Sequence, residues 1–396
     1  MKKTLIAAAA ATFALAGAAA ADGHAVKIGV IFGFTGPIES LTPDMAAGAE
    51  LAMKEVADSG ALLGGKAPTS VRGDSTCIDA AAASSAAERL ITSDGVAAIV
   101  GADCSGVTTA ILQNVAMANG VVMVSPSATS PALSSIEDNG LFFRTAPSDA
   151  RQGQVIAEIL GEKGIGEIAI SFTNNDYGKG LADSIQSNFE AAGGKVTLSA
   201  PHEDGKADYS AEVGALASAG GEVLVVAGYV DQGGKGVIQA SLDTGAFDTF
   251  VLPDGMIGDS LTDALGADLN GSWGTIPGTD SPGAAKFGDV MGAAGVNVGP
   301  FTAESYDAAA LIMLAMQAAG STASADLQAK MMDVANAPGE KIYPGELAKG
   351  LKILAGGGEI DYVGASAVEL IGAGESAGNY REVIVKGGKM ETAGYR

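Results

Sequence analysis

Residues 99–133 constrain the fold more than any other stretch, because they read as strand, turn, helix, strand and turn. Both turns follow apolar runs and are rich in Ser, Thr and Gly. In an open parallel sheet such turns lie at the carboxyl ends of strands, where ligands bind. Ser105 would open the helix, whose first backbone N–H groups are unpaired and attract an anion. The stretch predicts a small-anion cradle, although capping helices is the commoner role of such hydroxyls.

The alternation of strand and helix continues on both sides of this stretch. One series begins with the apolar run at residues 26–31, and a second begins at residues 151–161 and ends near residue 252. Two such series predict an α/β protein with two doubly wound parallel-sheet lobes that face a cleft. Within the first series, Thr42 is expected to cap a helix that has Pro43 at its first position.

The lobe boundaries follow from where the pattern restarts. Helical segments after residue 271 are expected to return to the first lobe, and residues 381–385 look like a closing strand. Short crossovers near Ala146, Pro277 and Asn379 would form the hinge. We therefore expect an N-terminal lobe of residues 22–146 plus 277–378 and a C-terminal lobe of residues 147–276 plus 379–396.

The first residues read as a secretory signal peptide, residues 1–21. Lys2 and Lys3 precede an apolar region at residues 4–18, and Ala19-Ala20-Ala21 gives a small-x-small cleavage site. No later run of about twenty apolar residues follows, so stable membrane insertion is not expected. The expected location is the periplasm.

Length and charge narrow the classes of partner. The 396 residues are too many for one compact core and suit two lobes. The formal net charge of −23 argues against nucleic-acid backbones and anionic membrane surfaces as partners.

Two cysteines, Cys77 and Cys104, occur in the chain. In an exported protein an even count favours a disulfide. The alternatives are free thiols or a metal site, and the latter has little support because His24 and His202 are the only histidines.

Enzyme-like motifs do not form a catalytic set. Gly258-Asp259-Ser260-Leu261 matches a GDSL hydrolase signature, but no histidine follows Ser260 to take its proton. Neither a P-loop nor a strand-linked dinucleotide motif is present. The sequence therefore indicates binding rather than catalysis, with no cofactor and no metal.

Several segments together resemble the periplasmic solute-binding proteins of branched-chain amino-acid ABC transporters: KIGVIFGFTGPIESLTPDMAAGAELAMKEV, DSTCIDAAAASSAAERLI, GADCSGVT, VSPSATSPAL, NNDYGKGLADS, LPDGM and ESYDAAALIMLAM. The resemblance covers nearly all of the chain after residue 21. It implies a type I periplasmic binding protein, whose two lobes are joined by a three-crossover hinge and close over a solute. It also implies that Cys77 and Cys104 form the family's disulfide.

Seven positions match the family's ligand site: Ser105, Ser127, Thr129, Tyr177, Gly228, Tyr229 and Asp254. By this resemblance, the serines and Thr129 hold the carboxylate and ammonium of an amino acid, Tyr177 forms an aromatic wall, and Asp254 pairs with the ammonium. Without the resemblance, Asp254 would read as a turn residue in Pro-Asp-Gly.

The sequence also departs from the family's pattern. The loop after Pro37 lacks the aromatic residue that often walls the side-chain pocket, where Leu41 or Phe34 could serve instead, and Asp254 is one carbon shorter than the usual Glu. The resulting hypothesis is a receptor, monomeric by default, that delivers an amino-acid-like solute to an ABC permease. The alternatives are a receptor for a non-amino-acid carboxylate, amide or urea, and a secreted hydrolase that uses Ser260 or Ser105.

Overall fold

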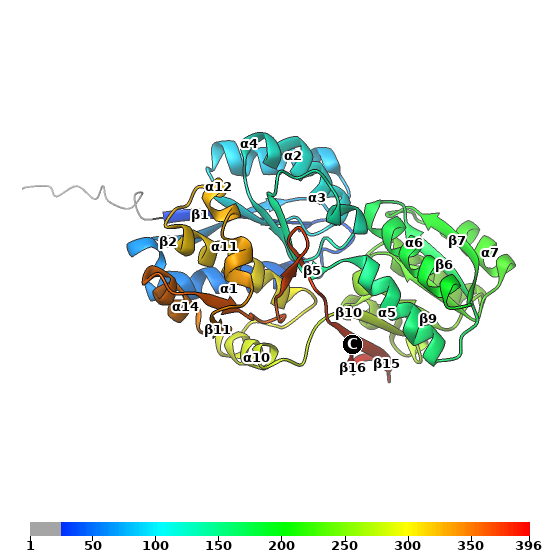
Figure 1. Cartoon of the computed structure of the whole chain (residues 1–396). Coiled ribbons are helices and arrows are strands. Elements are labelled where there is room, and N and C mark those ends of the chain that lie inside the picture. Colours follow the sequence, from blue (N-terminus) through cyan, green and yellow to red (C-terminus); the bar gives the residue numbers. More distant parts are fainter. Residues whose placement is uncertain (1–24) are drawn as a thin grey trace, which may run out of the picture.

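Two seven-stranded sheets organise the protein, each at the centre of one lobe (Figure 1). The structure is a computed structural model that describes residues 25–396. The expected signal peptide lies outside these residues. We use the names N-terminal lobe and C-terminal lobe for the halves built around the first and the second sheet.

The first sheet has the order β13-β14-β5-β4-β3-β1-β2, and its strands from β5 to β2 are all parallel. Its strands are β1 (Ala25–Phe32), β2 (Ala67–Asp74), β3 (Ala98–Gly101), β4 (Met123–Ser125), β5 (Phe142–Pro147), β13 (Leu370–Ile371) and β14 (Glu375–Ser376). β3 is buried throughout and β1 is buried from Ile28 to Phe32, as expected for strands that are covered on both faces.

The second sheet has the order β16-β15-β10-β9-β8-β6-β7. Its strands are β6 (Glu167–Thr173), β7 (Lys195–His202), β8 (Val223–Ala227), β9 (Phe250–Leu252), β10 (Trp273–Pro277), β15 (Tyr380–Lys386) and β16 (Lys389–Tyr395). The strands from β7 to β10 are parallel, whereas β15 and β16 join antiparallel at the edge. The predicted doubly wound parallel sheets are thus confirmed, with antiparallel edge strands added to them.

The chain passes between the two sheets three times. It leaves the first sheet after β5, returns after β10, and crosses again between β14 and β15. Figure 1 shows the last crossing as the red C-terminal segment that runs from one lobe to the other. A further two-stranded parallel sheet pairs β11 (Glu340–Ile342) with β12 (Ile360–Tyr362).

Helices flank both sheets (Figure 1). They are α1 (Thr42–Ser59), α2 (Ala80–Glu88), α3 (Ser105–Ile111), α4 (Met117–Asn119), α5 (Asp149–Glu162), α6 (Asp176–Ala191), α7 (Ser210–Ala219), α8 (Gly233–Thr244), α9 (Asp259–Leu265), α10 (Pro282–Ala294), α11 (Thr302–Ala319), α12 (Ser324–Gln328), α13 (Met331–Ala335) and α14 (Leu347–Ala355). Short 3-10 or π segments are η1 (Leu62–Gly64), η2 (Arg89–Ser93), η3 (Leu112–Ala116), η4 (Pro131–Ser134), η5 (Asp254–Met256) and η6 (Gly266–Leu269).

The expected capping role of Thr42 is wrong. Thr42 is already helical, Leu41 precedes it at the cap position, and no side chain caps this end. The Thr42 hydroxyl instead donates to the Gly33 carbonyl at 3.2 Å, which ties the start of α1 to the loop after β1.

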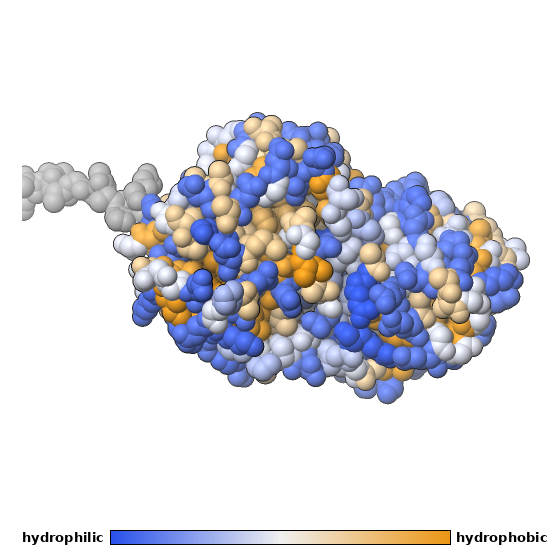
Figure 2. All heavy atoms as spheres, in the orientation of Figure 1, coloured by the Kyte–Doolittle hydropathy of each residue, from blue (hydrophilic) through white to orange (hydrophobic). Residues whose placement is uncertain are grey.

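α11 is the most deeply buried helix of the N-terminal lobe. It packs along α1, and nearly all of its residues up to Met316 are buried. Its apolar residues therefore form part of the core. Within residues 25–396 no helix combines the length and the apolar character needed to cross a membrane. Figure 2 shows hydrophilic residues over most of the visible face, with apolar groups in smaller patches.

A disulfide joins Cys77 and Cys104, as predicted. Cys77 lies in the loop after β2, and Cys104 is the residue immediately before α3. The bond therefore fixes two neighbouring loops at the same edge of the first sheet.

Replacing both cysteines by serine should lower the free energy of unfolding by roughly 3–4 kcal/mol, because an unfolded chain without the cross-link gains conformational freedom. Urea unfolding of the oxidised protein and of the double variant would measure the difference. Dithiothreitol should destabilise only the protein that carries the bond. Equal midpoints for the two proteins would show that the disulfide contributes nothing to stability.

Candidate functional site

A small cavity lies between the lobes, at the carboxyl edges of both sheets. Its volume is about 20 Å³, which is close to the space that one water molecule needs. It is lined by Ile38, Leu41, Asp103, Cys104, Ser105, Ser127 and Phe301 of the N-terminal lobe and by Tyr177, Tyr229, Asp254 and Gly255 of the C-terminal lobe. We call this space the cleft cavity; its size means that the lobes are closed on one another.

Five of the residues singled out from the sequence line the cleft cavity: Ser105, Ser127, Tyr177, Tyr229 and Asp254. Thr129 and Gly228 lie just behind its wall. A Cβ built on Gly255 would lie 2.5 Å from the Gly228 carbonyl oxygen and 2.7 Å from the Tyr177 hydroxyl. Leu41 is one of the apolar wall residues, whereas Phe34 packs near Phe32 and under Arg72 instead.

The N-terminal lobe presents a helix start to the cavity. Ser105 opens α3, and the helical run continues through η3 and α4 to Asn119. The Ser105 hydroxyl accepts a hydrogen bond from the Ser130 backbone N–H at 3.1 Å, and Ser127 Oγ donates to the Asp103 carbonyl at 3.0 Å. These bonds join the loops after β3 and β4. The unpaired N–H groups at the helix start favour a negative charge here.

Asp103 is buried beside this helix start, but its carboxylate is occupied by other partners. It accepts hydrogen bonds from the Gly33 backbone N–H at 2.6 Å and from Ser75 Oγ at 2.8 Å. Burial raises the pKa of Asp103 in spite of these bonds. Its side chain therefore ties the loop after β1 to the first sheet.

The C-terminal lobe presents two stacked tyrosines and a carboxylate. The rings of Tyr177 and Tyr229 lie 5.2 Å apart and nearly parallel. The Tyr177 hydroxyl donates to Asp254 Oδ1 at 2.7 Å and accepts from the Gly255 N–H at 3.1 Å. Burial raises the pKa of Tyr177 well above its usual value, so its hydroxyl keeps the proton that it donates. Asn175 Nδ2 donates to the Tyr229 hydroxyl at 3.2 Å and orients the second ring.

Asp149 is a buried acid near Asp254 that the sequence reasoning missed. It begins α5, directly after β5, and is fully buried. Within the described residues neither of its carboxylate oxygens has a hydrogen-bond partner, and neither has the Thr129 hydroxyl. The Asp149 backbone N–H donates to the Thr129 carbonyl at 2.8 Å, which places the two side by side. The sequence could have pointed to Asp149, since it follows a predicted strand whose carboxyl end lies at the same sheet edge as Ser105.

Asp149 and Asp254 influence one another electrostatically. Burial and the charge of Asp254 raise the pKa of Asp149 well above its usual value, while the nearby Thr129 hydroxyl and the charge of Arg144 lower it. Burial raises the pKa of Asp254 to about 6, although the hydrogen bond from Tyr177 opposes this shift. Two buried carboxyl groups with raised pKa values are better accommodated beside a cation than beside one another.

Hydrogen bonds also join the lobes beside the cleft cavity. Asp231 of the C-terminal lobe accepts from the Ser40 backbone N–H at 2.9 Å, and its own N–H donates to the Pro37 carbonyl at 3.0 Å. Ser260 Oγ donates to Asp231 Oδ1 at 2.7 Å. Ser260 of the GDSL-like motif is thus part of this interlobe contact. His202 lies elsewhere, hydrogen-bonded to Ser171, and burial lowers its pKa to about 4.

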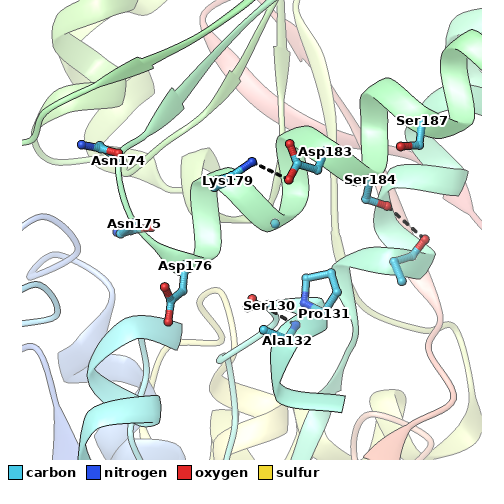
Figure 3. A pocket seen from close by; sticks show the side chains of 12 residues that line it. Ser130, Pro131, Ala132, Asn174, Asn175, Asp176, Lys179, Asp183, Ser184 and Ser187 are labelled. Atoms are coloured by element: carbon cyan, nitrogen blue, oxygen red, sulfur yellow. Dashed lines mark hydrogen bonds and ion pairs between the residues drawn. The ribbon is translucent and has the colours of Figure 1, made fainter. Parts of the chain in front are cut away.

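A wider groove opens between η4 and the first turns of α6 (Figure 3). Its volume is about 650 Å³, and Lys179 on its wall is paired with Asp183 at 2.7 Å. A Cβ on Gly180 would lie 2.8 Å from Pro131 Cδ, so the lobes touch here. None of the seven residues expected from the sequence lines this groove, and we therefore place the candidate site in the cleft cavity. No cluster of three metal-binding side chains occurs within residues 25–396.

Two lobes that meet around a small enclosed cavity define a ligand-binding protein that closes on its ligand. Residues 25–343 match the family described as periplasmic binding protein. The chain is 32% identical over 335 residues to the Leu/Ile/Val-binding protein homolog 3 of Brucella melitensis. The aligned residues cover 82% of this chain and 86% of that relative. The chain belongs to the periplasmic binding protein family, and the resemblance read from the sequence is confirmed.

Solved structures show the same fold. The leucine binding protein LivK of Thermotoga maritima has a TM-score of 0.79 at 22% identity, over 93% of this chain and 98% of that one. A solute binding protein of an ABC transporter from R. palustris, in complex with 4-hydroxybenzoate, has a TM-score of 0.77 at 18% identity, over 94% and 97%. Proteins of this fold therefore differ in the ligand that they hold.

The raised pKa of Asp254 predicts a pH-dependent stability. The folded state binds a proton at this group up to about pH 6, whereas the unfolded chain releases it near 3.8, so the stabilisation present at low pH is lost as the pH rises between these values. Asp254→Asn should reduce the loss of unfolding free energy between pH 4 and pH 7, by an amount on the order of 2–3 kcal/mol.

Urea unfolding across this pH range would measure the effect. Asp183→Asn is the matched control, because Asp183 lies in an exposed surface pair. Parallel pH profiles for the wild type and Asp254→Asn would rule out the raised pKa.

Proposed function

We propose that this chain is a periplasmic receptor without catalytic activity, which binds a small amino-acid-like solute between its lobes and delivers it to an ABC permease. The observation that carries the proposal is the division of the cleft cavity into two electrostatic halves. Helix-start N–H groups and hydroxyls at Ser105 and Ser127 suit a carboxylate. Asp149, Asp254 and Thr129 supply acceptors that suit an ammonium group.

The ligand-binding roles of the individual residues belong to this proposal. Ser105 and Ser127 bind the ligand carboxylate. Thr129 of the N-terminal lobe binds the ammonium, and Asp149 at the start of α5 supports it from behind. Asp254 binds the same ammonium from the C-terminal lobe, so one ligand bridges both lobes and favours their closure. Tyr177 and Tyr229 form the aromatic wall. Gly228 supports it from behind, where a Cβ would lie 2.9 Å from Gly234 Cα and 3.1 Å from the His202 ring.

Apolar side chains define the remainder of the pocket. Ile38, Leu41 and Phe301 line the cleft cavity from the N-terminal lobe. They favour a ligand with an apolar side chain, in keeping with the Leu/Ile/Val-binding relatives. Because the cavity in the closed state measures only about 20 Å³, such a ligand enters through opening of the lobes and repacking of these side chains.

A carboxylate without an amino group is the second candidate, and the 4-hydroxybenzoate complex of a structural neighbour gives it a specific basis. Such a ligand would leave Asp149 and Asp254 without a cationic partner. Both carboxyl groups would then be protonated, in keeping with their raised pKa values, since an unpaired buried charge is costly. The two candidates therefore differ in the charge that they bring to these carboxylates.

A thermal-shift screen of the ligand-stripped protein separates the candidates. A ligand that binds only the folded state raises the melting temperature by mass action. The screen compares aliphatic L-amino acids with the matching 2-hydroxy acids, benzoate, simple amides and urea. A rise with the amino acids but not with their hydroxy analogues supports the ammonium site. A rise with carboxylates or amides alone overturns it, and no rise with any compound contradicts the receptor proposal.

Asp254→Ala should weaken the binding of the amino acid found in the screen by tenfold or more, because it removes a charge-assisted contact in a closed site. Asp149→Asn should weaken it less, because it removes only the negative charge behind Thr129. Ser105→Ala should weaken binding less, because the backbone N–H groups of the helix start remain. Isothermal titration would give the dissociation constants, with Asp183→Asn as the charge-matched surface control. Unchanged affinity in Asp254→Ala would remove Asp254 from the ammonium site.

A further inference from the structure

A second cavity lies on the hinge side of the interlobe contact. Its volume is about 190 Å³, and its walls come from β10 and β15 of the C-terminal lobe and from α10 and the start of α11 in the N-terminal lobe. We call it the hinge cavity. Phe301 lines both the hinge cavity and the cleft cavity, so its ring is the partition between them.

One wall of the hinge cavity carries a guanidinium group without a partner. Arg381, on β15, makes no side-chain hydrogen bond and no ion pair with any residue between 25 and 396. It also borders an adjoining groove that contains four acids, none of which is paired with it: Asp44, Asp259, Asp263 and Glu391. The positive charge is therefore available to a ligand in the hinge cavity.

Glu304 is the second unusual group of this cavity. It lies in the first turn of α11 and is only 3% exposed, yet no other described residue donates a hydrogen bond to its carboxylate. Burial raises its pKa to about 8; the charge of Asp307 on the same helix adds to the shift, and that of Arg381 opposes it. At neutral pH Glu304 is therefore a carboxylic acid that can donate a hydrogen bond.

The start of α11 also favours a negatively charged ligand in the hinge cavity. Ala303 and Glu304, at the first turn of this long helix, both line it, so the positive end of the helix faces the space. Ile276 and Phe287 supply apolar wall. The cavity thus combines a cation, a neutral acid and a helix start with a hydrophobic surface.

We propose that the hinge cavity is a binding site for a small organic carboxylate, distinct from the cleft cavity. The ligand's carboxylate pairs with Arg381 and accepts a hydrogen bond from Glu304, while its apolar part packs on Phe287 and Ile276. The volume suits a compound of a few heavy atoms, since drug-sized ligands occupy larger pockets. Because both lobes contribute walls, occupation of this site is linked to the arrangement of the lobes. The proposal does not depend on the identity of the cleft ligand.

The test uses 3,3,3-trifluoropropionate, a small carboxylate whose binding can be followed by fluorine NMR titration of the full protein. Wild type at pH 6.5 should bind it saturably, and Arg381→Gln should weaken binding by tenfold or more. Lys54→Gln is the matched control, because it removes one positive charge from an exposed pair and should leave binding unchanged. Absence of saturable binding to the wild type, or equal binding to Arg381→Gln, overturns the proposal.

The pH dependence tests Glu304 separately. Ionisation above its pKa of about 8 replaces a donor with a negative charge, so wild-type binding should weaken by about tenfold from pH 6.5 to pH 9.5. Tyr395 also lines the cavity, and Tyr395→Phe should keep this dependence, whereas Glu304→Gln should lose it. The same pH dependence in Glu304→Gln would exclude Glu304. Loss of binding in Ser105→Ala but not in Arg381→Gln would place the probe in the cleft cavity and overturn the hinge site.

Discussion

Two carboxylates of the C-terminal lobe, Asp149 at the start of α5 and Asp254 after β9, are buried where the charge of one disfavours the ionisation of the other. Closure removes both from water, and the folded state can accommodate this in two ways: by taking up protons or by enclosing a cation. This constraint links the pH dependence of stability, the closure of the lobes and the choice of ligand. A zwitterion satisfies it directly, because its ammonium group meets the carboxylates while its carboxylate meets the helix start at Ser105.

Contacts outside the cleft cavity hold the same closed arrangement. Asp231 bonds with Ser40 and Pro37 across the lobe boundary, and Ser260 completes this set. These bonds do not involve the ligand, so closure has a stabilising contribution of its own. A ligand shifts the balance between the closed and open states by its preference for the closed state.

The sequence was sufficient to predict the two-sheet architecture, because alternating strands and helices leave few topologies. It also predicted most of the cavity lining, because residues that follow parallel strands gather at one edge. Asp149 and Phe301 were missed for different reasons. Asp149 occupies a helix start that reads as an ordinary first-turn acid, and only burial shows that its oxygens lack partners. Phe301 reaches the cavity from a distant loop whose course no local pattern reveals. The Thr42 error arose because its hydroxyl bonds to Gly33, a tertiary contact, rather than to its own helix.

The position of the disulfide has a consequence for how the site is assembled. Cys104 immediately precedes Ser105, so the residue that opens α3 is anchored covalently to the loop after β2. Oxidation therefore does more than restrict the unfolded chain: it also fixes the position of the start of α3, which faces the cleft cavity. A reduced chain would contain the same cavity-lining residues without this anchor, so thiol oxidation acts as a maturation step for the N-terminal side of the cleft cavity.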